Sequence, residues 1–87
     1  MKVSAKVITR LQNEGRLKGI ATVCLDGTFL ITGVRIVDCQ KGLTVFMPSR
    51  KTSTEYLDIC FPITQQLHQE IKRVVLEAYE REPEKER

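Results

Sequence analysis

Leu25-Asp26-Gly27-Thr28 joins two stretches rich in apolar and β-branched residues, 17–25 and 29–37. Asp-Gly tolerates the positive φ angles that a type I′ turn requires, so the tetrapeptide predicts a tight β-hairpin. Within 17–25 the alternation puts four apolar side chains on one face: Leu17, Ala21, Val23 and Leu25. Residues 29–37 carry apolar side chains on both faces, which predicts a central strand covered on both sides.

Upstream of this hairpin, residues 2–11 also alternate, and Asn13-Glu14-Gly15 supplies the residues of a connecting turn. If Leu11 faces Leu17, Arg10 falls opposite Lys18 on the other face, and Lys6 continues that face along the strand. Like charges directly across a strand pair are destabilising, so a polyanion over this face would explain the arrangement. Long side chains that splay apart in water explain it equally well.

Downstream, the apolar run 42–47 stops at Pro48, which cannot donate to a β-ladder. Two cations flanked by hydroxyls follow directly: Ser49, Arg50, Lys51 and Thr52. On an exposed loop these donors suit the oxygens of phosphate groups. A solvated turn that only aids solubility is the alternative. Residues 56–61 form a candidate last strand, which Pro62 ends.

The remainder of the chain predicts one helix that begins after the N-cap Thr64. Its apolar stripe consists of Leu67, Ile71, Val74, Val75 and Ala78. Leu76 falls opposite this stripe, as a lone exposed leucine or as a partner contact. The polar start of the helix offers Gln66, Gln69 and Lys72, which either read base edges or form a solvated face.

The 87 residues suffice for one domain, expected over residues 1–82, with a charged and disordered tail at 83–87. Residues 1–54 hold nine cations and three acids, whereas residues 55–87 hold five cations and eight acids. A basic first segment suggests an electropositive surface there.

Several classes of protein find little support in the sequence. The three cysteines lack a C-x-x-C spacing and the single histidine, His68, stands apart from them, so we expect no disulfide scaffold, no metal and no cofactor. No glycine-rich phosphate loop or catalytic grouping is present, which argues against an enzyme with a small-molecule substrate. Without a long apolar run or a signal-peptide core, we expect a cytoplasmic protein with no membrane contact.

The order of several short motifs is similar to that of the SpoVG family, the stage V sporulation protein G or septation regulators of bacteria. These motifs are Val34-Arg35-Ile36-Val37-Asp38, Met47-Pro48-Ser49-Arg50-Lys51-Thr52, Asp58-Ile59, Pro62-Ile63 and Val75-Leu76 with Tyr79. The resemblance implies a small antiparallel sheet with a C-terminal helix, a homodimer, and a regulator of septation or sporulation that binds DNA and also RNA. The family's basic pair corresponds to Arg50 and Lys51. The chain departs from the family at Phe61, where a histidine is usual, and at 53–55, which lack the usual proline and glycine.

We therefore expect an α+β fold with an antiparallel sheet of four to five strands followed by one helix. The apolar third strand, the small core and Leu76 predict a C2 homodimer. The expected function is nucleic-acid binding, and the alternative is a cell-division interaction module that binds an acidic protein partner. The candidate binding residues are Ser49, Arg50, Lys51, Thr52, Lys6, Arg10, Lys18, Gln66, Gln69 and Lys72.

Overall fold

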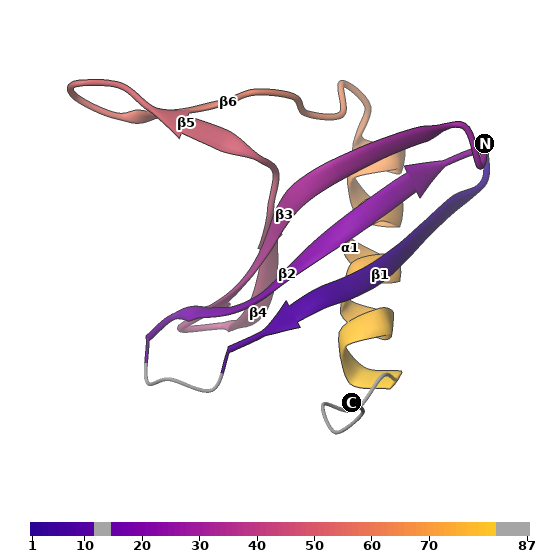
Figure 1. The fold of residues 1–87 in the computed structure, drawn as a ribbon, viewed down its shortest axis with the longest axis horizontal. Coiled ribbons are helices and arrows are strands. Elements are labelled where there is room, and N and C mark those ends of the chain that lie inside the picture. The colour runs from indigo at the N-terminus through magenta and orange to yellow at the C-terminus, as the bar shows by residue number, and fades with distance from the viewer. Residues whose placement is uncertain (12–14, 82–87) are drawn as a thin grey trace.

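A computed structural model describes residues 1–11 and 15–81. Most of the turn expected at 13–15, the expected domain boundary at residue 82 and the tail at 83–87 lie outside these residues. The chain forms an α+β fold (Figure 1), as the sequence predicted. Its elements are β1 (Val3–Arg10), β2 (Leu17–Leu25), β3 (Phe29–Cys39), β4 (Gly42–Phe46), β5 (Ser49–Lys51), β6 (Tyr56–Asp58) and α1 (Gln65–Arg81).

The first four strands form one antiparallel sheet in the order β1-β2-β3-β4, so every strand pairs with its neighbour in the chain. The predicted turn joins β2 to β3. Asp26 and Gly27 have φ angles of 56° and 69°, and Thr28 N donates to Leu25 O at 3.0 Å. Both positive φ values match a type I′ turn, which confirms the reading of Asp-Gly.

The pairing register of this sheet shifts at three places: between Val7 and Thr9, between Leu17 and Gly19, and between Ala21 and Val23. The third shift lies opposite Gly33 of β3, whose φ of 80° suits glycine. Each shift moves the following side chains to the other face of the sheet. Strict alternation therefore gave a wrong register: Arg10 pairs with Gly19, not with Lys18.

One face of the sheet packs against α1, which lies across it (Figure 1). Thr64 Oγ1 accepts a hydrogen bond from Leu67 N at 3.2 Å, so the predicted N-cap is confirmed. Ile71, Val75 and Ala78 are at most 3% exposed, which confirms the apolar stripe. Ile71 and Val75 share one buried cluster with Val23, Val34 and Ile36.

Two expectations about apolar side chains are wrong. Leu76 is half-buried and packs against the core of its own chain, so it is not a lone exposed leucine. The inner position of strand β3 in the sheet is confirmed, but within this chain it is not covered on both sides, since Phe29 and Leu30 are 61% and 59% exposed. In the described part of the chain, no helix is both long and apolar enough to span a membrane.

Gly19 allows β1 and β2 to approach closely, and its replacement tests the register. A Cβ atom at this position would lie 2.9 Å from the backbone oxygen of Thr9. Gly19→Ala should therefore lower the free energy of unfolding by about 1–3 kcal/mol in urea titrations. Ser4→Ala, exposed on the same strand pair, serves as the control and should change it by less than about 0.5 kcal/mol. Equal stability of the two variants would contradict this packing.

Candidate nucleic-acid interface

Strands β5 and β6 form a second, two-stranded sheet that projects from the body of the molecule (Figure 1). We call residues 49–58 the arm. Arg50 pairs with Leu57 and Lys51 with Tyr56 across it. The basic pair thus lies on a strand, whereas the sequence predicted a loop. The expected strand at 56–61 is shorter and ends at Asp58.

The arm is fixed at its base by hydrogen bonds of Arg35 in β3 and of the segment that follows the arm. The Arg35 guanidinium donates to Ser49 Oγ at 3.0 Å and to the Met47 carbonyl at 3.5 Å. Ile59 N donates to Pro48 O at 2.8 Å, on the other side of the base. These contacts hold the position from which the arm leaves the sheet.

The tip of the arm is closed by the Thr52 side chain. Its hydroxyl donates to Glu55 O at 2.9 Å and accepts from Glu55 N at 3.1 Å. Thr52 N also donates to Glu55 O at 2.7 Å. The hydroxyls of Thr52 and Ser49, which the sequence suggested as phosphate donors, are therefore used within the chain.

Arg50 and Lys51 are both exposed, and neither forms an ion pair with another residue in the described ranges. Because successive side chains of a strand point to opposite faces, the two cations lie on opposite faces of the arm. Each shares its face with an apolar partner, Leu57 or Tyr56. The arm thus presents a cation and an apolar side chain on either side.

The other predicted basic residues do not extend this surface. Arg10 lies 4.6 Å from the centroid of the Tyr79 ring and donates to the Ala78 carbonyl at 3.4 Å. The shift between Val7 and Thr9 places it on the helix side of the sheet. The prediction that Arg10 shares a face with Lys6 is therefore wrong. Lys6 is exposed on the opposite face, while Lys18 is half-buried at another register shift.

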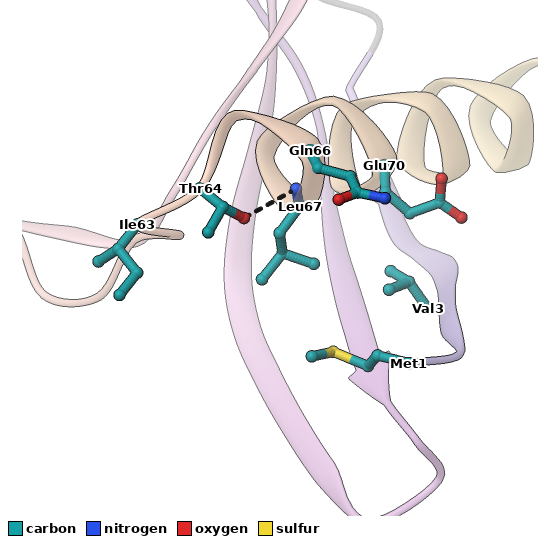
Figure 2. A pocket seen from close by; sticks show the side chains of 7 residues that line it. All are labelled: Met1, Val3, Ile63, Thr64, Gln66, Leu67 and Glu70. Carbon is teal, nitrogen blue, oxygen red and sulfur yellow. Dashed lines mark hydrogen bonds between the residues drawn. The ribbon is translucent and has the colours of Figure 1, made fainter.

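The polar start of α1 divides between two surfaces. Gln66 lines an apolar pocket of about 370 Å³ with Met1, Val3, Ile63 and Leu67 (Figure 2). Gln69 is exposed. Lys72 lines a different and wider depression beside β4, together with Arg16 and Lys41.

Sequence reasoning missed three residues that this geometry brings forward. Arg35 was no site candidate, although a cation between Val34 and Ile36 in an apolar strand was a signal that it has a specific partner. Arg16 and Lys41 entered only the charge count, and no local pattern joins them to Lys72.

Not every exposed cation is available to a ligand. Arg73 donates to Glu70 at 2.6 Å and to Glu77 at 3.1 Å. These hydrogen bonds, with the charges of the two carboxylates, raise the pKa of Arg73. All three cysteines carry free thiols. Within residues 1–11 and 15–81, no cluster of histidine, cysteine or acidic side chains could hold a metal ion.

The structure defines a small α+β protein with one helix, a four-stranded sheet and a basic hairpin arm. The sequence profile of the SpoVG family matches residues 1–81. Relatives named "Putative septation protein SpoVG" include one from Caldicellulosiruptor saccharolyticus, 40% identical over 81 residues that cover 92% of both chains. Another from Lachnospira eligens is 33% identical over 93% of both chains. One from Staphylococcus saprophyticus is 36% identical over 92% of this chain and 80% of its own. This chain belongs to the SpoVG family.

The contact between Arg10 and Tyr79 should be measurable as a coupling energy. Arg10→Ala and Tyr79→Leu each remove one partner, and the double variant completes the thermodynamic cycle. We expect the two changes to be non-additive by about 0.5–1 kcal/mol in chemical unfolding, as for a partly exposed cation–π pair. Fully additive effects would show that the two side chains act independently.

Proposed function

We propose that this protein is a bacterial regulator that binds DNA, and also RNA, through the arm. The observation that carries the proposal is the exposure of Arg50 and Lys51 on a narrow hairpin that stands clear of the sheet. Neither cation has an ion-pair partner among the residues described. The major groove of B-DNA admits a two-stranded β-ribbon of this kind. Cations on opposite faces of such a ribbon would reach phosphates on both sides of the groove.

The apolar partners of the two cations fit the same role. Tyr56 and Leu57 are 65% and 42% exposed near the tip. An aromatic ring can stack on a base, and an aliphatic side chain can contact a thymine methyl group. The arm thus combines phosphate contacts, which supply affinity, with groups able to contact bases.

We further propose that the protein acts as a homodimer. An isolated two-stranded hairpin is marginally stable in water, so a second copy could add support to the arm. In addition, the segment that follows the arm exposes three large apolar side chains. Ile59, Phe61 and Ile63 are 64%, 61% and 89% exposed. Of these three, Ile63 lines the apolar pocket of Figure 2. A two-fold axis near this segment would cover the side chains and the pockets of both copies at once.

The cellular role follows from the family. The names of the relatives refer to septation, so we propose a regulatory role in septation and cell division, extending to sporulation where the host forms spores. Family membership favours a non-enzymatic role. The alternative function is a protein-interaction module in cell division, in which the arm meets an acidic protein surface in place of nucleic acid. Direct binding of purified protein to DNA and RNA separates the two.

The basic pair of the arm should account for a defined part of the salt dependence. Arg50→Ala/Lys51→Ala should weaken binding to duplex DNA and flatten the slope of log affinity against log salt by roughly two units, one for each lost phosphate contact. Fluorescence anisotropy over a salt series measures both quantities, and circular dichroism checks the fold.

Arg73→Ala/Arg81→Ala is the matched control, because it removes the same charge from the exposed side of α1. It should leave the slope nearly unchanged. If wild type binds and the folded arm variant keeps both affinity and slope, the arm is not the contact. If wild type binds neither DNA nor RNA, the protein-interaction alternative replaces the proposal.

The apolar segment after the arm should control assembly. Light scattering of the wild type at micromolar concentration should return twice the 10.0 kDa mass of the chain. Phe61→Ser/Ile63→Ser should shift the mass toward one chain, because both changes add polar groups to the proposed contact. Phe29→Ser/Leu30→Ser, on exposed residues of β3, is the control and should stay dimeric. A monomeric wild type would refute the homodimer.

A further inference from the structure

A wide depression beside β4 has a chemistry distinct from that of the arm. It has a volume of about 660 Å³ and lies where the β3–β4 turn, the residue before β2 and the middle of α1 meet. We call it the β4 groove. The lining residues that carry the argument are Arg16, Gln40, Lys41, Thr44, Phe46 and Lys72.

The β4 groove gathers cations that are far apart in the sequence. Arg16 precedes β2, Lys41 lies in the β3–β4 turn, and Lys72 comes from α1. No acidic side chain among the described residues lines the groove, and none of the three cations has an ion-pair partner there. Like charges gathered in one depression, with no acidic neighbour among the described residues, favour a ligand with several negative charges.

The backbone around the groove places these cations by specific contacts. Asp38 N donates to Arg16 O at 2.8 Å, which fastens the segment before β2 to the end of β3. Gly42, with a φ of 120°, allows the turn that presents Lys41. Lys72 is half-buried and lines the groove from the side of α1.

An aromatic ring stands at the end of the groove nearest the arm. Phe46 is 44% exposed, and the Arg35 guanidinium lies 5.6 Å from its ring centroid. Single-strand binding sites combine cations placed along the phosphate backbone of the nucleic acid with an exposed aromatic ring on which a base can stack. In a duplex the base faces are already stacked, so a ring of this kind has no use there.

We propose that the β4 groove binds single-stranded nucleic acid, with Arg16, Lys41 and Lys72 on phosphates and Phe46 stacked on a base. The inference rests on the proposed function and adds to it the class of ligand and a second site. Along the protein chain, Phe46 leads through Met47 and Pro48 directly to the arm. A nucleic-acid strand that followed β4 out of the groove would therefore reach Arg50 and Lys51. The contacts involve phosphate and base, which DNA and RNA share.

The test uses fluorescent oligothymidylate and oligouridylate of about 15 nucleotides, and a duplex of the same length. Arg16→Ala/Lys41→Ala should flatten the salt slope for the single strands by roughly 1.4 units, the expectation for two lost contacts. Phe46→Leu keeps an apolar side chain but removes the ring. It should lower the affinity for single strands about fivefold or more, leave the salt slope unchanged and spare the duplex. Arg73→Ala/Arg81→Ala again provides the charge-matched control.

The outcomes separate this inference from the proposed function. If wild type binds nucleic acid and the folded groove variants bind single strands as wild type does, the groove is overturned and the arm proposal stands. If Phe46→Leu lowers the affinity for single strands and for the duplex equally, the ring does not stack on a base and the single-strand assignment fails. If wild type binds no nucleic acid, both proposals fall. Groove variants that bind both oligothymidylate and oligouridylate more weakly than wild type support the groove. Variants that bind both as tightly as wild type overturn it.

Discussion

The rest of this structure depends on the burial of one helix against one face of a four-stranded sheet. Ile71 and Val75 belong to one buried cluster with side chains of β2 and β3, and this cluster forms most of the core. A single helix of 17 residues covers one face, so the second face and the arm remain outside the core. In a chain of this size the core is small. Apolar side chains left outside it therefore favour a second copy as a source of stability.

One register shift of the sheet adds a further contact with the helix. Strict alternation over β1 would turn Arg10 away from the helix, but the shift after Val7 turns it inward. There it stacks on Tyr79 and donates to a carbonyl of the last helical turn. A cation near a helix C-terminus also interacts favourably with the helix dipole. The irregularity of β1 thus supplies α1 with a contact that a regular strand could not make.

This explains which features could be predicted from the sequence. The Asp26-Gly27 turn and the Thr64 cap depend on neighbouring residues, and both were predicted correctly. The register shifts depend on pairing between strands, which local sequence does not reveal. The face of the sheet on which Arg10 lies was therefore predicted wrongly. The motif around Arg50 identified a distinctive segment, but its pairing with β6, which the Thr52 hydroxyl closes at the tip, was not predicted. The β4 groove combines residues 16, 41 and 72, and only the fold brings them together.

The structure also separates cations that a charge count treats alike. Three arginines have specific partners within the chain: Arg10 with Tyr79, Arg35 with Ser49, and Arg73 with two glutamates. The planar guanidinium suits such contacts because it stacks and donates several hydrogen bonds in fixed directions. The cations of the arm and the β4 groove have no ion-pair partner among the described residues, and they lie at the two ends of β4. A polyanion would therefore be drawn toward β4, whereas Arg10 of β1, which is engaged with Tyr79, would contribute little. Affinity for nucleic acid should then depend on where the unpaired cations lie, and the net charge of +3 is a poor guide to it.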